Sequence, residues 1–343
     1  MQLQDNYPLK DVTTLRLGGP AKKFVRVKTE EDLIEAIKYA RETKMPYLVI
    51  GGGSNLLVSD EGFAGLVIKN EITGTNTSKV GPDSFEVNVK SGTPLQELID
   101  YTIQKGLSGL QKLTGIPGTV GGAVYGNAGA YGQSISDHLV TVTAIDPSVI
   151  TDDSSLLKTK RMQPLTHTDG STCLEDIHTL KCPLTKEECQ FSYRGSIFKK
   201  IKYPILEVTF QFEQGDPHIL QQEADEIKTK RLVKYPPGIK CPGCFFKNIV
   251  ANTLPKDILD KIPPEKIVYD KLPAGALLEM VGAKGQRIDG IRIAEYHANL
   301  FINDGGNAKT FYNLAKIYAL KVKEKFNITL DPEIQLINLP PLI

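Results

Sequence analysis

The sequence predicts a protein of mixed α and β structure that folds as two or three domains. Its 343 residues are enough for several domains that each bury a core. Short strands and helical periodicities follow one another along most of the chain. A group of turn-forming residues, Tyr235 to Gly238, marks a boundary between two such stretches.

The first part of the chain predicts alternating strands and helices. Lys23 to Lys28 fits a short strand, and a helix follows in which Thr29 and Asp32 fit a capping box. That helix should end before Pro46. Further elements are expected as strands at Tyr47 to Ile50, Leu66 to Ile68, Phe85 to Val89 and His138 to Asp146, and as a helix from Thr93 that stops at Gly106.

The rest of the chain predicts an insertion and then a second unit. Pro147 to Pro183 is polar and poor in periodicity, which indicates a surface insertion. A strand from Leu206 to Phe212 and a helix from Ile219 to Val233 follow. The second unit ends with a helix that carries Phe311, Leu314, Tyr318 and Val322 on one face, and a last strand, Ile334 to Ile337, is expected to return to the first domain.

Charge and targeting signals exclude several classes of protein. Lysine plus arginine (41) nearly balances aspartate plus glutamate (40), so no large field gathers nucleic acid or an anionic membrane. The N-terminal residues lack the pattern of a signal peptide, and no apolar run approaches the ~20 residues of a membrane helix. We therefore expect a cytoplasmic protein without membrane insertion or a nucleic-acid partner.

Five cysteines, an odd number, favour reduced thiols: Cys173, Cys182, Cys189, Cys241 and Cys244.

Two glycine-rich segments suggest a ligand site. The first is Gly51, Gly52, Gly53, Ser54 and Asn55, directly after a strand. Successive glycines leave backbone N–H groups open to phosphate oxygens, although an ordinary turn fits this loop as well. The second, Pro117 to Gly132, has six glycines and few charges, so it can wind around a flat, partly apolar ligand. A flexible linker is the alternative, but interleaved apolar residues argue against it. Neither segment matches a Rossmann fingerprint or a P-loop.

Several motifs occur in a fixed order: GGGSN with the following SD and GF, IPGTVGGAVYGNAGAYG, FSYRGSIFK, FFKN, HANLFIN and LDPEI. Together they resemble the MurB family, the UDP-N-acetylenolpyruvoylglucosamine reductases. The similarity extends from about Thr13 to Ile337 and is interrupted by the insertion. The resemblance implies an α+β fold with a two-subdomain FAD-binding part of the vanillyl-alcohol-oxidase type and a C-terminal α/β substrate-binding domain. The expected parts are a first FAD-binding subdomain (1–70), a second FAD-binding subdomain (71–234), a substrate-binding domain (235–327) and a C-terminal strand that returns to the FAD domain (328–343).

The resemblance also implies a reaction in two halves. NADPH gives hydride to the FAD cofactor, and the reduced flavin then gives hydride to UDP-N-acetylglucosamine enolpyruvate, forming UDP-N-acetylmuramate for peptidoglycan synthesis. No metal is implied, and we expect a monomer. The residues expected to hold FAD are Gly51, Gly52, Gly53, Ser54, Asn55, Pro117, Gly118, Gly121, Gly122, Asn127, Gly129 and Ala130.

Three residues match the family's catalytic positions. Arg194, in YRGS, matches an arginine whose planar cation suits a carboxylate that gains negative charge, although a surface ion pair is the alternative. Glu333, in DPEI, matches a glutamate that acts with it, or is an ordinary strand-edge residue. Cys244 stands where much of the family has the serine that donates a proton. A thiol, with a pKa near ~8.5, is more acidic than an alcohol and can do the same step.

The Cys241-x-x-Cys244 spacing has a competing interpretation. It also occurs in thioredoxin-like redox motifs and in half of a zinc site. Zinc needs two further ligands, which the sequence does not show, and a thioredoxin-like pair opens a helix after a strand, whereas Pro237 and Gly238 precede this pair.

Tyr131 and Asn248 match substrate-facing motif positions, although Tyr131 also fits a packing aromatic. Lys234, like Arg231, aligns loosely with basic residues that face the substrate phosphates in the family, because the loop between is shorter here. His297 is left outside the catalytic set, since a lone histidine beside an apolar strand is more often structural. Two other functions stay open: a different flavin oxidoreductase of the same fold, or an inactive nucleotide-sugar binding protein.

Overall fold

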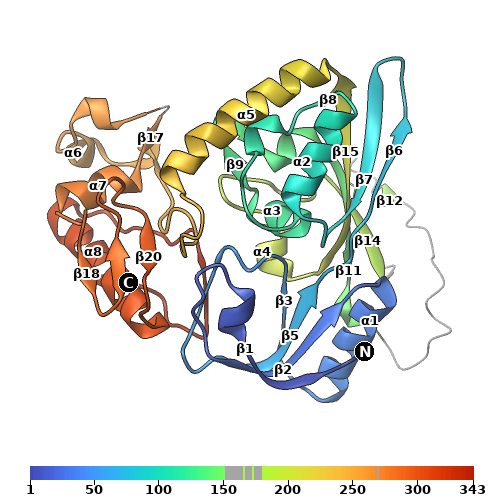
Figure 1. The fold of residues 1–343 in the computed structure, drawn as a ribbon, viewed down its shortest axis with the longest axis horizontal. Helices are drawn as coiled ribbons and strands as arrows, with labels where there is room; N and C mark the ends of the chain where they lie inside the picture. Colours follow the sequence, from blue (N-terminus) through green and yellow to red (C-terminus); the bar gives the residue numbers. More distant parts are fainter. Residues whose placement is uncertain (151–164, 167–171, 174–179, 269) are drawn as a thin grey trace. The chain divides into compact units, whose positions relative to one another are not determined.

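The structure, a computed structural model, describes residues 1–150, 165–166, 172–173, 180–268 and 270–343 (Figure 1). These residues form two compact units. The first unit comprises Met1–Leu3, Val25–Gly51 and Leu66–Lys230, and the second comprises Gln4–Phe24, Gly52–Gly65 and Arg231–Ile343. The division into four segments expected from the sequence stays a prediction, and most of the expected insertion lies outside the described residues.

The first unit contains most of the strands. They are β3 (Tyr47–Ile50), β6 (Thr75–Lys79), β7 (Ser84–Lys90), β8 (Leu107–Ser108), β9 (Gly129–Ala130), β10 (Gln133–Ser134), β11 (Leu139–Ile145), β12 (Leu165–Thr166), β13 (Thr172–Cys173), β14 (Lys181–Thr185) and β15 (Ile205–Gln214). Its helices are α1 (Glu30–Glu42), α2 (Leu95–Gln104), α3 (Val120–Gly126) and α4 (Phe198–Ile201). The boundary between the units falls within β2 (Pro20–Val27), β5 (Phe63–Asn70) and α5 (Pro217–Lys234).

An antiparallel sheet organises the first unit. Its strand order is β14-β11-β15-β7-β6, and β8 also pairs with β15. Helices α2 and α3 lie against one face of this sheet (Figure 1). Val208, Phe210 and Phe212 alternate with polar residues along β15, so one face of the strand enters the core with Leu98 of α2 and Val124 of α3.

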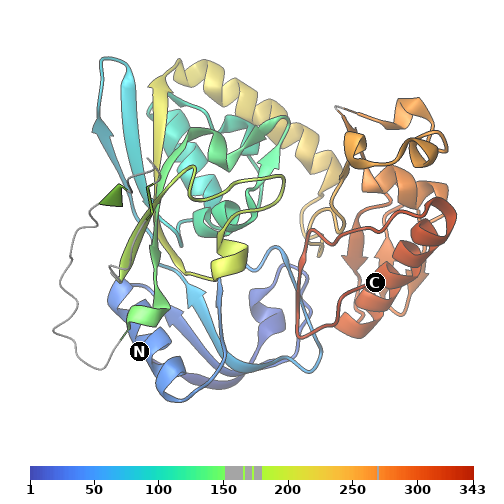
Figure 2. The same cartoon turned by 180° about the vertical axis from the view of Figure 1, so that it is seen from behind.

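A smaller core surrounds α1. Strands β3 and β5 pair in parallel, and Leu33 and Ile37 of α1 pack with Ile68 of β5. Helix α1 is the blue helix beside the N-terminus in the view from behind (Figure 2). The helix begins where the sequence predicts, because the Thr29 hydroxyl accepts a hydrogen bond from the N–H of Asp32 at 3.2 Å. It ends at Glu42, before the proline, so this prediction is confirmed.

The second unit is built from short strands around one long helix. Its strands are β1 (Gln4–Pro8), β4 (Leu56–Val58), β16 (Ile249–Val250), β17 (Lys271–Leu272), β18 (Arg287–Ile288), β19 (Ile291–Ile293), β20 (Phe301–Asn303) and β21 (Gln335–Ile337), and its helices are α6 (Lys256–Leu259), α7 (Ala274–Met280) and α8 (Ala308–Phe326). Helix α8 packs on the β18-β19-β20 sheet and buries all four aromatic and aliphatic residues of its predicted apolar face.

Aromatic packing and helix capping hold the second unit together. Phe245 lies with its ring centroid 4.8 Å from that of Phe246 and 5.2 Å from that of Phe301. The Asp60 carboxylate accepts hydrogen bonds from the first two N–H groups of α8, at 2.9 Å each. An acidic side chain at a helix N-terminus satisfies orphan donors and complements the helix dipole.

Of the elements that the sequence pattern did not predict, two lie in or directly after the glycine segments. Strand β4 is three residues long and pairs in parallel with β21, and only that distant partner makes it a strand. The second glycine segment, expected as a winding loop, contains helix α3. Within the described part of the chain, no helix is long and apolar enough to cross a membrane.

Candidate functional site

In the first unit, the two glycine segments meet at Gly51. A Cβ on Gly51 would collide with the Thr119 hydroxyl, so only glycine fits at this contact. The Lys69 ammonium donates a hydrogen bond to the Gly51 carbonyl, and burial lowers the pKa of Lys69. The end of β3 is therefore fixed against the residue that caps α3.

Helix α3 shows why the second segment needs its glycines. Thr119 caps the helix by accepting a hydrogen bond from the Gly122 N–H at 3.3 Å. Gly121 is tight against the chain, since an added Cβ would lie 2.8 Å from that of Ser91. Gly122 and Gly126 have more space around them. A Cβ added to Gly122 would lie 3.5 Å from the Thr119 hydroxyl oxygen, its one described contact, and a Cβ added to Gly126 would have no described atom within 4 Å. The bare backbone of these two glycines is open to a ligand.

The C-terminal end of α3 holds the Arg194 turn. Asn127 ends the helix in the left-handed conformation, with φ 44°, and its Nδ2 donates to the Ser192 carbonyl at 2.9 Å. Ser192 and Gly195 exchange two backbone hydrogen bonds of 3.1 Å, which makes a tight turn around Tyr193 and Arg194. Arg194 has φ 56°, a conformation that costs a non-glycine residue about 1–2 kcal/mol. Such strain, held by the surrounding bonds, is common at functional sites.

Further contacts orient this region. The Lys199 ammonium donates to the Arg194 carbonyl at 2.6 Å, and the Arg194 guanidinium lies 5.4 Å from the centre of the Tyr193 ring. Asn127 is only 7% exposed, and its Oδ1 is buried without a hydrogen-bond partner among the described residues. A buried acceptor of this kind favours an additional donor, such as that of a bound ligand.

Tyr131 stands at the tip of a hairpin formed by β9 and β10. Tyr131 and Gly132 both have positive φ, 51° and 81°, as a type I′ turn requires. The Tyr131 side chain is 48% exposed, so the packing alternative does not describe it. Gly129 and Ala130 form strand β9, whereas Pro117 and Gly118 precede α3, where the Gly118 carbonyl accepts a hydrogen bond from Leu95 at 3.0 Å.

In the second unit, the remainder of the first glycine loop, Gly52 to Asn55, is tied to the C-terminal segment. Gly53 has φ 68°, and a Cβ there would overlap the Val12 carbonyl. Asn55 Nδ2 donates to the Glu333 carbonyl at 3.0 Å, and the Asn55 carbonyl accepts from Gln335 at 3.0 Å. These bonds bring the GGGSN and DPEI segments together.

The GCFFKN segment is hydrogen-bonded to two other predicted motifs, HANLFIN and LDPEI. The Phe245 N–H donates to the Asn299 carbonyl at 3.0 Å, and the Phe245 carbonyl accepts from Glu333 at 2.7 Å. Asn299 also bonds both backbone groups of Phe246 through its side-chain amide. Asn248 Oδ1 accepts from Ala274 at 3.2 Å, at the start of α7. The unit therefore brings the backbones of Asn55, Glu333 and the cysteine segment together, which no local pattern shows.

Cys244 has a basic and aromatic environment. Lys234 Nζ approaches Cys244 Sγ at 3.7 Å. Cys241 is 5% exposed, burial raises its pKa, and both thiols are outside any disulfide. No group of three His, Cys, Asp or Glu side chains among the described residues is placed to hold a metal.

Tyr235 is a residue that the sequence pattern assigned only to a boundary. Its ring centre lies 5.3 Å from Lys234 Nζ and 5.0 Å from the Arg231 guanidinium carbon. Burial, and next the adjacent Cys244, raise the pKa of Tyr235. The available signal is an aromatic residue directly after Lys234 and one helical turn after Arg231, a few positions before the cysteine pair.

His297 is a hydrogen-bond acceptor in this part of the unit. Burial, and next the charge of Lys234, lower the pKa of His297 to about 4, so the ring is neutral at neutral pH. Its Nδ1 accepts from the Asn299 N–H at 3.2 Å. The ring therefore supports the Asn299 backbone, whose side chain positions Phe246.

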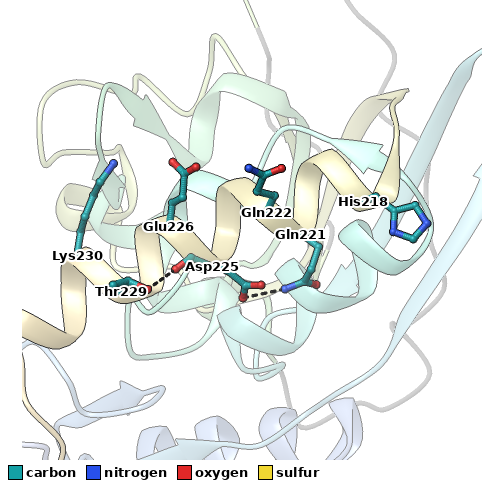
Figure 3. A pocket seen from close by; sticks show the side chains of 7 residues that line it. All are labelled: His218, Gln221, Gln222, Asp225, Glu226, Thr229 and Lys230. Carbon is teal, nitrogen blue, oxygen red and sulfur yellow. Dashed lines mark hydrogen bonds between the residues drawn. The ribbon is translucent and has the colours of Figure 1, made fainter.

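A hollow along α5 contains none of the predicted site residues. Seven polar side chains line it: His218, Gln221, Gln222, Asp225, Glu226, Thr229 and Lys230 (Figure 3). Gln221 Nε2 donates to the Asp225 carboxylate at 3.1 Å, and the Thr229 hydroxyl donates to the Asp225 carbonyl at 2.9 Å. These are pairs one helical turn apart, as on an ordinary solvated helix face.

Comparisons with known proteins cover both units. Residues 21–149 match the family model described as FAD binding domain, and residues 235–337 match that of the UDP-N-acetylenolpyruvoylglucosamine reductase C-terminal domain. A UDP-N-acetylenolpyruvoylglucosamine reductase from Solibacter usitatus is 36% identical over 96% of this chain and 95% of its own. One from Listeria innocua is 31% identical over 97% of this chain and 94% of its own.

A solved structure supports the same assignment. The UDP-N-acetylenolpyruvylglucosamine reductase (MurB) from Thermus caldophilus has a TM-score of 0.66 and 28% identity, and the match covers 98% of each chain. The predicted fold class, an FAD-binding part followed by a C-terminal domain in a chain of mixed helix and sheet, is confirmed. The chain belongs to the UDP-N-acetylenolpyruvoylglucosamine reductase family.

Proposed function

We propose that this protein reduces UDP-N-acetylglucosamine enolpyruvate to UDP-N-acetylmuramate, with FAD as cofactor and NADPH as the source of electrons. The reaction serves peptidoglycan synthesis in the cytoplasm, and the enzyme acts as a monomer. The observation that carries the proposal is the place of Cys244. Its thiol lies 3.7 Å from the Lys234 ammonium, in a segment bonded to the Glu333 backbone, within a chain similar over its whole length to reductases of this name.

The glycine segments fit the cofactor. Gly122 and Gly126 leave open backbone on α3, and the buried Asn127 Oδ1 would accept a hydrogen bond from the cofactor. Gly52, Gly53, Ser54 and Asn55 would supply backbone and side-chain donors to the phosphates of FAD. Gly51, Pro117, Gly118, Gly121, Gly129 and Ala130 would make the other contacts with the cofactor. When bound, FAD supplies hydride to the substrate carbon.

Arg194 stabilises the charge that this addition creates. Hydride addition to an enolpyruvyl group moves negative charge toward the neighbouring carboxylate. A guanidinium presents a planar, permanently charged donor fork to that carboxylate. The strained turn and its bond to Asn127 hold the backbone of Arg194 in place before substrate arrives, so little reorganisation is needed.

Glu333 and Cys244 complete the chemistry. Glu333 acts with Arg194 on the substrate carboxylate, carrying a proton when it is desolvated. Cys244 gives its thiol proton to the carbon next to the carboxylate, and the sulfur keeps the electron pair as a thiolate. The nearby Lys234 ammonium favours that negative charge. Lys234, Asn248 and the exposed Tyr131 bind the phosphates and carboxylate of the substrate.

An anaerobic half-reaction experiment tests the function. Purified protein should be yellow, NADPH should bleach the flavin absorption, and UDP-N-acetylglucosamine enolpyruvate should restore it without oxygen. Protein that stays colourless after incubation with FAD would leave only a nucleotide-sugar binding role. A flavin that is reoxidised by oxygen but not by the UDP-sugar would indicate a different flavin oxidoreductase.

A further inference from the structure

Strand β5 ends beside the first glycine loop. In the parallel pair of β3 and β5, Lys69 is in register with Ile50, the residue before Gly51. The Lys69 ammonium donates a hydrogen bond to the Gly51 carbonyl, so the side chain lies along the start of the loop. Lys69 is half-buried, and burial lowers its pKa, because a charge is less stable away from water. The fold therefore keeps a cation at this position at a cost.

The charge of Lys69 is not neutralised within the described fold. Glu71, two residues further along the chain, bonds instead to the Arg26 guanidinium at 2.5 Å. Among the described residues, no carboxylate forms an ion pair with Lys69, and its ammonium bonds to a neutral carbonyl. A half-buried cation is stabilised by an opposite charge, and a bound anion is a group that can supply it here.

A neutral network ties the other glycine segment to the end of β5. Asn70 Nδ2 donates to the Ser91 hydroxyl at 2.8 Å, and that hydroxyl donates to the Ile205 carbonyl at 2.5 Å. The Ser91 carbonyl accepts from the Gly121 N–H at 2.8 Å. Asn70 and Ser91 are both buried and uncharged. Neutral hydrogen bonds therefore anchor that segment, whereas Lys69 adds a charge to the first one.

The bond from Lys69 also sets the direction of the next N–H group. The Gly51–Gly52 peptide is trans, and in a trans peptide the C=O and N–H bonds point in opposite directions. Because its carbonyl is held by Lys69, this peptide turns the Gly52 N–H away from the ammonium. A cation on the carbonyl also polarises the peptide, which makes the N–H a stronger donor. This donor is one of those that would meet the FAD phosphates.

We propose that Lys69 is a positioning residue for the pyrophosphate of FAD. Its ammonium holds and polarises the Gly51–Gly52 peptide so that the Gly52 N–H donates to a phosphate oxygen, and its charge lowers the cost of placing the pyrophosphate there. Lys69 lies outside both glycine segments, on the neighbouring strand. This role rests on the proposed function, in which the first glycine loop meets the cofactor phosphates.

Titration of FAD into the full-length protein freed of flavin tests this role. Lys69→Met keeps an unbranched side chain but loses the charge and the hydrogen bond. At about 10 mM salt, where charges act over ~30 Å, we expect the Kd for FAD to rise about tenfold, as for one hydrogen bond to a charged group. At about 1 M salt, where this range is ~3 Å, the difference from the wild type should narrow to about threefold or less.

Urea unfolding of the same flavin-free proteins separates binding from folding. Because the fold disfavours the charge of Lys69, Lys69→Met should unfold at the same urea concentration as the wild type or at a higher one. A loss of FAD affinity that is equal at both salt concentrations, together with a lower urea midpoint, would show a merely structural role and overturn the proposal.

Lys90 provides a matched control within the same unit. It lies on β7, and its ammonium pairs with the Glu207 carboxylate of β15. Lys90→Met also removes one positive charge, but we expect the Kd for FAD and its salt dependence to stay as in the wild type. Wild-type affinity in Lys69→Met at low salt, or an equal loss in both variants, would contradict the role of Lys69.

Reductase activity of the wild type separates this role from the proposed function. A wild-type protein that binds FAD but is not reoxidised by the UDP-sugar would contradict the proposed function, even where Lys69→Met shows the salt-dependent loss of affinity. An active wild type, combined with unchanged FAD affinity in Lys69→Met, would contradict only the role of Lys69.

Discussion

The side-chain amide of Asn55 donates a hydrogen bond to the backbone carbonyl of Glu333 at 3.0 Å. These residues are 278 positions apart, yet the bond joins the first glycine loop to the segment with the proposed catalytic glutamate. The Glu333 N–H in turn donates to Phe245, the neighbour of Cys244. The first glycine loop and the Glu333 backbone are therefore joined by a direct hydrogen bond.

Two glycines should respond differently to alanine. Gly122 lies in α3, where a Cβ meets only one oxygen at 3.5 Å, so Gly122→Ala should keep or raise the stability of the protein without flavin by up to about 1 kcal/mol. If FAD covers the Gly122 backbone, the affinity of Gly122→Ala for FAD should be lower than that of the wild type. Isothermal titration of FAD and urea unfolding of the flavin-free protein measure the two effects. Gly53→Ala is the contrast, because its φ of 68° and the Val12 carbonyl should make it destabilising. Unchanged FAD affinity in Gly122→Ala would contradict the proposed FAD contact.

Replacement of Cys244 should separate the two half-reactions. Cys244→Ala should leave flavin reduction by NADPH intact and slow substrate reduction by about 10²–10⁴-fold, the usual contribution of a general acid. Cys244→Ser should recover part of this loss. Stopped-flow absorbance under anaerobic conditions measures both steps. Equal slowing of both steps would point to a damaged fold.

Arginine at position 194 should not be replaceable by lysine. Arg194→Lys keeps the charge but loses the planar fork, and we expect reoxidation by the UDP-sugar to slow by about 10²-fold or more. Lys199→Met is a useful comparison, because the Lys199 ammonium donates to the Arg194 backbone carbonyl. It should have a smaller effect. Wild-type kinetics in Arg194→Lys would show that the residue does not stabilise the developing charge.

His297 should make folding stability sensitive to acid. Its pKa is lowered from 6.5 to about 4 in the folded protein, so the unfolded chain binds the proton more readily between these values. Stability should therefore fall as pH decreases from about 6.5 toward 4, by at most about 1.4 kcal/mol per pH unit from this group. His297→Asn keeps an acceptor for Asn299 and should flatten this dependence. Urea unfolding at pH 7 and pH 5 compares the two proteins, and parallel pH dependences would exclude the effect.

Much of the secondary structure follows from local patterns. The cap at Thr29, the alternation along β15 and the apolar face of α8 each match their elements. These elements follow from short-range periodicity, and for the helix after Thr29 also from its cap, and the core buries the face that the pattern predicts. By contrast, β4 is a strand only because β21 lies beside it, and α3 forms inside a glycine-rich stretch because Thr119 caps it and Ser91 packs against it.

The sequence by itself determined the mixed fold, the two glycine segments and the identity of the family, because the order of motifs and the periodicity of apolar residues can be read along the chain. Only the tertiary structure decided which groups surround Cys244. The bond from Asn55 to Glu333, the strained turn at Arg194 and the approach of Lys234 to the Cys244 sulfur depend on contacts between segments and on burial. Such contacts arise from packing, and spacing along the chain does not encode them.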